Sequence, residues 1–271
     1  MLHVGSGQPF PTVADGLSEV TSMTWSDAVL VLHEGASFNE VASLDTGAVA
    51  FVNAPSEMPQ WIYSSMPATP TLTVTGADTR VYIQGILLRG NGNDVGLSCN
   101  GARVDVRRAR IVQNTGGGIV ASNSCQLYVE NSFLGGSENG VGAVDVNSAS
   151  ASVLYSSLTS GFAGATALAC TTPISVTVRN SILLVGADSD AVACDQATIS
   201  TSATEDIVGN FNGTQAWFTD YAVGDLSLAP VGAVAFGNTA QWIDGDPSID
   251  IDGDPRPAGD SGLDYAGADV P

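Results

Sequence analysis

Residues 104–111 read Val-Asp-Val-Arg-Arg-Ala-Arg-Ile, and residues 176–183 read Val-Thr-Val-Arg-Asn-Ser-Ile-Leu. Both carry one pattern, in which an apolar residue is followed by four variable residues and a second apolar residue. The pattern occurs six times, in the pairs Ile83/Leu88, Val106/Ile111, Val129/Leu134, Val153/Leu158, Val178/Leu183 and Ala203/Val208. The leading residues are 23, 23, 24, 25 and 25 positions apart, and such a period is typical of repeat proteins.

The repeating unit is built from strands. Segments such as Gln126-Leu-Tyr-Val129 alternate with period two and are rich in β-branched or aromatic residues, and turns such as Asn91-Gly-Asn lie between them. One coil cannot bury its apolar side chains alone, but coils stacked at the strand spacing of about 4.8 Å form a continuous core. The sequence therefore predicts a parallel β-helix over residues 81–208.

The repeat also predicts which outward side chains stack. The position after the leading residue places Arg107 over Glu130, as an opposite-charge pair. At the next position Asn131 and Asn180 recur, each followed by serine, and Asn suits a bend because it tolerates a left-handed backbone. This bend column is predicted to run Gly85, Arg108, Asn131, Tyr155, Asn180 and Glu205.

The composition limits the possible partners. The chain of 271 residues is 44% hydrophobic, which is enough for a large core, and the repeat favours one elongated domain. It has 28 acidic residues against 8 basic ones, all arginine, and a net charge of −20 argues against DNA, RNA or an anionic membrane. Because no run of 18 apolar residues occurs, we expect no transmembrane segment.

Four cysteines lie in the coil region, and none has the Cys-x-x-Cys spacing of zinc or redox sites. Cys170 and Cys194 are 24 residues apart, or one coil, in matching contexts, so they should stack. Cys99 and Cys125 are 26 apart and slightly out of register. We expect these two pairs to form disulfides, which would favour an oxidising, exported location. The alternative is that all four are small buried apolar side chains.

The N-terminal segment predicts a cap and irregular early coils. Apolar residues at Val13, Leu17 and Val20 indicate a short helix from Thr12, its N-cap, to Val20. Residues 28–32 form a continuous apolar strand, and strands at 48–52 and 71–74 are separated by prolines. The loop over 55–63 gathers aromatic residues, which either stack on a sugar or pack against the coil wall.

The order of Gln8-Pro-Phe-Pro-Thr-Val-Ala-Asp-Gly-Leu17, an apolar strand, and Glu34-Gly-Ala-Ser-Phe-Asn-Glu40 resembles the opening of right-handed parallel β-helix proteins of the pectate-lyase and pectinesterase-like superfamily. In that family the helix caps the coil stack and the Gly-x-x-aromatic-x-Glu turn starts it. The resemblance implies an all-β, single-stranded, right-handed parallel β-helix with a short N-terminal capping helix. It implies little about activity, because one fold carries many different sites.

The C-terminal region resembles the end of many exported bacterial β-helix proteins. Residues 250–256 match their Asp-x-Asp-Gly-x-Pro-Arg turn, but the final Asp-apolar-Gly-Ala-x-Glu pattern has an insertion before Gly267 and Val270 in place of the acid. The resemblance implies an extracellular or cell-surface domain over 1–271, with a cap at 1–40, irregular coils at 41–80, regular coils at 81–208 and a segment at 209–271 that covers the open coil end. Met1-Leu-His-Val lacks signal-peptide features, so we expect an export segment to be missing here.

Three acids near the C-terminus are candidate metal ligands. Asp250, Asp252 and Asp254 alternate, so an extended backbone would place their carboxylates on one side, as ligands for a structural calcium. However, Pro255 stands where an EF-hand loop needs glycine, and no glutamate follows at the twelfth position. The alternative is that these carboxylates cap turns or pair with Arg256. No other cofactor is expected.

The richest basic cluster lies between Arg103 and Arg110. Arg103, Asp105 and Arg107 should point outward from one strand, and together with Arg108 they are candidate catalytic residues of a polysaccharide lyase. The resemblance implies that such a lyase uses an Arg or Lys base beside acid-bound calcium. The alternative is that the arginines neutralise an acidic surface and pair with acids such as Glu130.

Two functions therefore remain open. Most outward positions are Ser, Thr, Asn or Gly, and general acid–base catalysis needs a few groups in a perturbed environment. We expect a monomeric module that binds a polysaccharide or a cell-surface component, or has a structural role, without turnover. A calcium-dependent polysaccharide lyase is the alternative. An acidic cleft with convergent arginine and a bound cation would favour the enzyme, and a smooth ladder surface the module.

Overall fold

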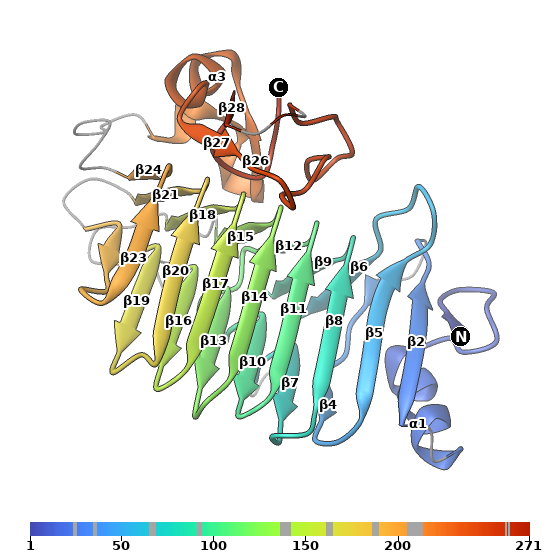
Figure 1. Cartoon of the computed structure of the whole chain (residues 1–271). Helices are drawn as coiled ribbons and strands as arrows, with labels where there is room; N and C mark the ends of the chain where they lie inside the picture. The colour runs from blue at the N-terminus through green and yellow to red at the C-terminus, as the bar shows by residue number, and fades with distance from the viewer. Residues whose placement is uncertain are drawn as a thin grey trace.

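The computed structural model describes residues 1–23, 26–34, 37–64, 69–90, 94–135, 142–160, 165–185, 190–204, 214–257, 259 and 261–271. Over these residues three parallel sheets wind into a solenoid of about seven turns (Figure 1). Each coil takes one strand from sheets A, B and C, in that order. The predicted parallel β-solenoid is therefore confirmed.

Sheet A contains β1 (Leu2–Val4), β2 (Asp27–Leu32), β5 (Ala48–Asn53), β8 (Arg80–Gln84), β11 (Arg103–Arg107), β14 (Gln126–Glu130), β17 (Ser150–Leu154), β20 (Ser175–Arg179) and β23 (Ala197–Ser200). Sheet B contains β3 (Ser37–Phe38), β6 (Gln60–Tyr63), β9 (Leu87–Gly90), β12 (Arg110–Val112), β15 (Phe133–Gly135), β18 (Ser157–Ser160), β21 (Ile182–Val185) and β24 (Ala203–Thr204). Sheet C contains β4 (Ala42–Leu44), β7 (Leu72–Thr75), β10 (Leu97–Asn100), β13 (Ile119–Ser122), β16 (Val144–Asn147), β19 (Leu168–Thr171) and β22 (Val192–Ala193).

The predicted coil register is correct through the middle of the stack. In sheet A one inward column runs through neighbouring strands in the predicted order, and each of its side chains is at most 1% exposed. The column consists of Ile83, Val106, Val129, Val153 and Val178. The first five of the six pairs are therefore placed as the sequence predicted.

The sixth pair was assigned incorrectly. The residue opposite Val178 is Ile199, only 21 positions on, whereas Ala203 lies in sheet B opposite Ile182. The last coil is shorter than the others, so counting a further 25 residues overshoots sheet A. Val208 lies outside the described residues.

Sheets A and B meet at a bend made by one residue with a left-handed backbone. Six coils share it, and φ lies between 45° and 67° at Gly85, Arg108, Asn131, Tyr155, Asn180 and Thr201. The prediction of an Asn-containing bend is confirmed. Thr201 occupies the place predicted for Glu205, and Glu205 itself lies outside the described residues.

A column of buried serines follows this bend. Each hydroxyl donates a hydrogen bond of 2.8–3.0 Å to the carbonyl two residues earlier in its own coil. Each also accepts an N–H from the preceding coil over 3.0–3.2 Å. The residues are Ser132, Ser156, Ser181 and Ser202. The ladder thus satisfies backbone groups that the tight turn removes from the sheets.

The predicted N-terminal helix is present as α1 (Val13–Ser22), capped by the Thr12 hydroxyl, which accepts the Asp15 N–H over 3.0 Å. The Glu40 carboxylate accepts the N–H groups of Val13 and Ala14 over 2.7 and 2.8 Å. An anion is favourable at a helix N-terminus, where N–H groups lack intrahelical partners. Glu40 therefore fixes the cap to the first coil.

Both predicted disulfides are present, so the alternative of four free thiols is wrong. Cys170 directly follows Ala169, which pairs with Ala193, so Cys170 and Cys194 stack in register. Cys99 pairs in sheet C with Ala121, and its disulfide partner Cys125 lies beyond that strand, at the turn into β14. Each disulfide joins two neighbouring coils.

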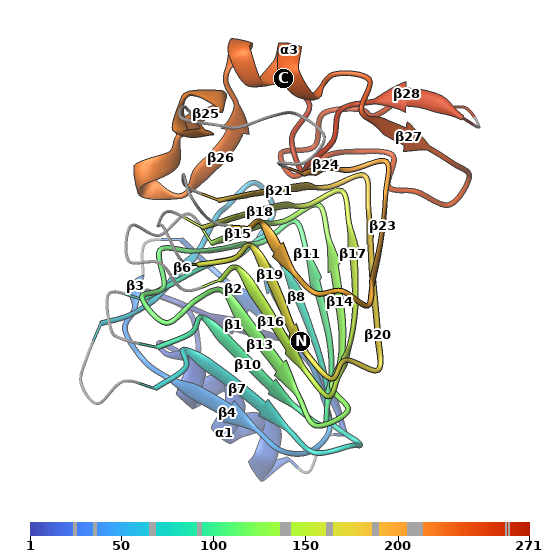
Figure 2. The same cartoon turned by 90° about the vertical axis from the view of Figure 1, so that its left-hand side faces the viewer.

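The C-terminal segment, residues 214–271, lies along the outer face of sheet B rather than across the open coil end that the sequence predicted (Figure 2). Its apolar side chains cover outward residues of sheet B such as Phe133 and Ile182, which are fully buried. Its elements are η1 (Thr214–Trp217), β25 (Phe218–Asp220), η2 (Tyr221–Val223), β26 (Asp225–Leu228), α3 (Pro230–Phe236), β27 (Ala240–Trp242) and β28 (Gly262–Asp264).

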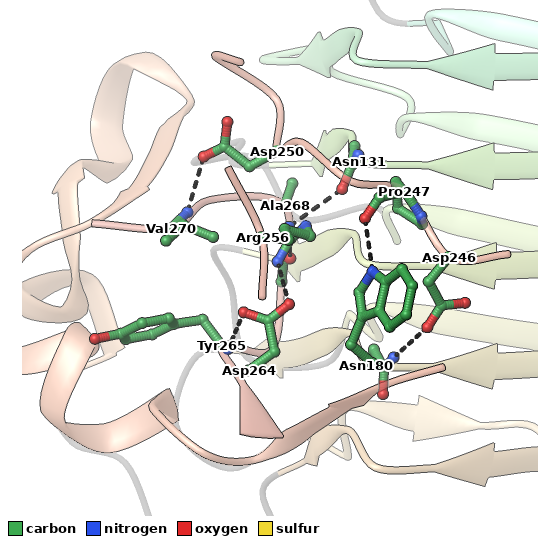
Figure 3. Close-up of polar contacts among 12 residues, drawn as sticks. Asn131, Asn180, Asp246, Pro247, Asp250, Arg256, Asp264, Tyr265, Ala268 and Val270 are labelled. Carbon is green, nitrogen blue, oxygen red and sulfur yellow. Dashed lines mark hydrogen bonds and ion pairs between the residues drawn. The ribbon is translucent and has the colours of Figure 1, made fainter. Parts of the chain in front are cut away.

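A buried arginine joins this segment to the bend column (Figure 3). Arg256 forms an ion pair with Asp264 over 3.1 Å, and both side chains are 0% exposed. Its guanidinium also donates to the Asn131 side chain and lies 4.0 Å from the centre of the Tyr155 ring. Asn180 exchanges hydrogen bonds of 2.9 and 3.1 Å with the backbone of Gln241. The bend column is therefore also the part of the solenoid to which the C-terminal segment is hydrogen-bonded.

The inward column predicts the cost of a buried charge. Val106→Asp should lower the free energy of unfolding by about 3 kcal/mol or more, because the carboxylate would be buried without a partner. Chemical denaturation measures this change. Ser175→Asp, on the exposed face of the same sheet, should change it by less than about 0.5 kcal/mol. Equal effects of the two substitutions would refute the register.

Asp269 predicts a pH-dependent stability. Burial raises the pKa of Asp269 to about 6, although its carboxylate accepts the Leu228 N–H over 2.7 Å. The folded protein therefore binds this proton more tightly than the unfolded chain does, and stability should fall as pH rises from about 4 to about 6. Asp269→Asn should remove that part of the slope in melting temperature against pH. Identical slopes in the two proteins would contradict the assignment.

Candidate functional site

Two of the three candidate arginines, Arg103 and Arg107, lie on the outer face of sheet A, at the two ends of β11. This strand lies between β8 and β14 in the middle of the stack (Figure 1). In β8, β11 and β14 the aliphatic residues point inward and the remaining residues point outward. We call the outward charged and aromatic residues of these strands the arginine–tyrosine patch: Arg80, Tyr82, Arg103, Asp105, Arg107, Tyr128 and Glu130. The patch contains three of the four candidate catalytic residues.

Strand register places opposite charges and aromatic rings next to one another in the patch. Asp105 lies between Tyr82 and Tyr128. Arg107 lies beside Glu130, as predicted, with 3.6 Å between a guanidinium nitrogen and a carboxylate oxygen. The two tyrosines are two strands apart, or roughly 10 Å at the usual strand spacing.

Arg103 is fixed in place by two neighbours. Its Nε and one terminal nitrogen donate to the Asp105 carboxylate over 2.9 and 3.2 Å, and its guanidinium lies 4.7 Å from the centre of the Tyr128 ring. The hydrogen bond with Asp105 raises the pKa of Arg103 above its ordinary value. Arg103 therefore keeps its proton, which is unfavourable for a general base.

Arg107 is held less tightly. Its guanidinium lies 5.9 Å from the centre of the Tyr82 ring, and within the described part of the chain it makes no hydrogen bond beyond the ion pair with Glu130. Its side chain is 48% exposed. Burial raises the pKa of Tyr82, so the Tyr82 hydroxyl stays protonated and bonds to Gln84. The guanidinium N–H groups of Arg107 are thus accessible to solvent, while the Tyr82 ring and the Glu130 carboxylate lie beside the side chain.

The patch differs from the rest of the molecule in charge. Its three arginines and two acids give a local charge of +1, whereas the whole chain carries −20. The outward positions of β17 and β20 are mainly Ser and Thr. Arg179, at the end of β20, is bound by Asp246 of the C-terminal segment. Exposed arginine and tyrosine are therefore concentrated on three strands.

The fourth candidate, Arg108, lies apart from the patch because it occupies the left-handed bend. Its Nε donates to the Ile251 carbonyl over 3.1 Å. Arg110, two residues on, binds Asp252 over 2.8 Å and lies 5.2 Å from the centre of the Phe133 ring. Arg108 and Arg110 both line a cleft between the solenoid and the C-terminal segment, which the sequence did not predict.

The aspartates predicted to bind calcium do not lie on an extended backbone. Residues 250–254 form a tight turn in which the Asp250 carboxylate accepts the N–H groups of Asp252, Gly253 and Asp254 over 2.7–2.9 Å. Its second oxygen accepts the Val270 N–H (Figure 3). Among the described residues, no three His, Cys, Asp or Glu side chains form a group suited to a metal ion. Turn capping accounts for Asp250, and calcium stays a prediction.

The aromatic loop over 55–63 does not present its tryptophan to a sugar. Trp61 is 0% exposed and packs against Phe51, with 5.4 Å between the ring centres. Its indole N–H donates to the Glu40 carbonyl over 2.8 Å. Trp61 is therefore part of the core. This agrees with the alternative that the aromatic residues of the loop pack against the coil wall.

Comparison with models of protein families, with curated proteins and with solved structures found no match to this chain. Over the described residues, no helix is long and apolar enough to cross a bilayer.

Proposed function

We propose that this protein is a non-catalytic binding module for acidic polysaccharides, with the arginine–tyrosine patch as its binding surface. The observation that carries the proposal is Arg107, an exposed guanidinium without a hydrogen bond in the described chain, held between a tyrosine and a glutamate on a flat sheet. A planar guanidinium binds a carboxylate through two parallel hydrogen bonds, which suits the uronate groups of an acidic glycan.

The tyrosines support this chemistry in two ways. Each ring lies beside one guanidinium and restricts its motion, which lowers the entropy cost of binding. Tyr128 is also 40% exposed, so its ring edge and hydroxyl can contact the apolar and hydroxyl faces of a sugar. Because the sheet repeats at about 4.8 Å, a polymer lying across several strands would meet similar groups more than once.

Exported location and family membership belong to the same proposal. Two disulfides are typical of proteins in oxidising compartments, which supports an extracellular or cell-surface location. The capping helix and the role of Glu40 agree with the resemblance to right-handed β-helix proteins of the pectate-lyase-like superfamily. We propose that the chain belongs with these proteins and acts as a monomer outside the bacterial cell.

The lyase alternative needs a base that can lose its proton. Arg103 is bound to Asp105 and its pKa is raised, so it is poorly suited to that role. Arg107 is also paired with an acid, since its guanidinium lies 3.6 Å from the Glu130 carboxylate. These pairings favour binding over turnover.

The binding proposal predicts the effect of substitutions in the patch. Arg107→Gln should weaken binding of a soluble polyuronate roughly tenfold to a hundredfold, because a charge-assisted hydrogen bond is lost. Tyr128→Ala should also weaken binding, because Arg103 loses the aromatic ring that lies beside its guanidinium. Thr177→Ala, at an exposed position of the same sheet column, is the matched control and should leave affinity unchanged. Titration calorimetry measures all three.

Two results would overturn this proposal. One is polyuronate binding that neither patch substitution changes. The other is release of unsaturated products from an acidic polysaccharide, abolished by Arg107→Ala, which would establish a lyase instead.

A further inference from the structure

A cleft of about 690 Å³ lies beyond the bend that ends β8 and β11. Its walls come from parts of the chain that are distant in sequence: Glu34, the loop over 53–58, the bend over 84–86 with the two arginines that follow in the next coil, and the turn at 251–252. Its volume falls within the range of about 300–1,000 Å³ typical of small-molecule sites. The patch lies on the other side of the bend, and the two surfaces adjoin at Gln84, which lines the cleft and accepts a hydrogen bond from Tyr82.

Arg108 is the group in the cleft with unused donors. Only its Nε is bonded, to the Ile251 carbonyl, and within the described chain its two terminal nitrogens have no hydrogen-bond partner. The left-handed backbone of residue 108 and this bond fix the direction of the side chain. A guanidinium with both terminal nitrogens free can bind one carboxylate through two parallel hydrogen bonds.

The opposite wall supplies acceptors. Glu34 accepts the Met58 N–H with one oxygen, and Glu57 accepts the Glu34 N–H, so these two segments hold each other in place. The second oxygen of Glu34 has no hydrogen-bond partner within the described chain. The base of the cleft is close-packed, because a Cβ at Gly85 would lie 2.2 Å from the Asn53 side-chain oxygen.

The charges restrict the ligand. Arg108 and Arg110 face Glu34, Glu57 and Asp252, so the lining carries a net charge of −1. A multiply charged anion such as phosphate would be repelled more strongly than a monoanion, while the hydroxyls of a neutral sugar would accept only weaker hydrogen bonds from Arg108, without charge assistance. A molecule with one carboxylate and several hydroxyls can bond to both walls: its carboxylate accepts from Arg108, and its hydroxyls donate to the acids.

We propose that this cleft is a binding site for a sugar acid, with the carboxylate on Arg108 and the hydroxyls on Glu34 and its neighbours. The ligand is either a free hexuronate or the uronate at the end of a chain, since both present the same groups. Binding would connect the early coils to the C-terminal turn, and it should raise the melting temperature through mass action. The site does not depend on the patch.

The test uses the whole protein with glucuronate and galacturonate as probes, in calorimetry and in thermal melting. At least one of the two should bind with one-to-one stoichiometry and raise the melting temperature, and glucose and inorganic phosphate should bind at least tenfold more weakly. Pro55→Trp, which fills the cleft without removing a charge or an N–H, should weaken binding at least tenfold. Arg108→Gln should do the same, and Arg107→Gln on the patch should have no effect.

A short oligouronate in the Arg107→Gln protein distinguishes the two sources. If the cleft takes a chain end, the oligomer should bind at least as tightly as the monomer and Pro55→Trp should weaken it; if the cleft takes the free acid, only the monomer should bind. The proposal is overturned if neither hexuronate binds, if phosphate binds equally well, or if neither cleft substitution changes affinity. Since the patch is tested separately with Arg107→Gln and polyuronate, failure of one proposal leaves the other standing.

Discussion

The fold depends on one backbone constraint, the left-handed residue that turns each coil from sheet A into sheet B. Six coils place φ between 45° and 67° there, although only one of these residues is glycine. A non-glycine residue in this conformation carries a local energetic cost, so the surrounding bonds must hold it. The serine ladder does so directly after the bend, where each hydroxyl bridges two coils.

The same bend determines how the C-terminal segment attaches. Asn131 and Asn180 leave their amides free to bond the backbone at Ile249 and Gln241, and Tyr155 offers its ring to Arg256. A fully buried ion pair such as Arg256–Asp264 contributes little net stability, because desolvation offsets the attraction. Removing either partner would leave a buried charge without a counterion. The main effect of the pair is therefore to select one docking position for the C-terminal segment, and its net contribution to stability is small.

Much of the solenoid could be predicted from local pattern. The register of Val106 follows from alternation and period, and the cysteine pairs follow from that register. The last coil could not be placed by counting, because it is shorter, but Ser202 continues the serine column and would have given the correct register. The run Ile182-Leu-Leu-Val185 is apolar on both faces, a signal that sheet B is covered on the outside.

The cleft and the C-terminal turn could not be predicted, for a different reason. Arg108 reaches Ile251 across more than a hundred residues, and no periodic pattern connects them. The alternation of Asp250, Asp252 and Asp254 is typical of an extended strand, but the backbone at these residues forms a tight turn. Gly253, with φ of 103°, allows a tight turn in which Asp250 binds its own backbone. Sequence patterns describe repeated neighbours well and single long-range contacts poorly.

The disulfide Cys170–Cys194 also has a mechanical consequence. In a stack held by contacts between adjacent coils, pulling on the C-terminal end would first peel off residues 214–271 and then unwind β23 and β24. Both strands follow Cys194 in the chain, so the disulfide stops the unwinding when it reaches Cys194, because the 24-residue loop back to Cys170 cannot extend. Tension is then transferred across the whole width of the next coil, whose strands must separate together. The solenoid therefore resists unzipping from the end where its coils are shortest.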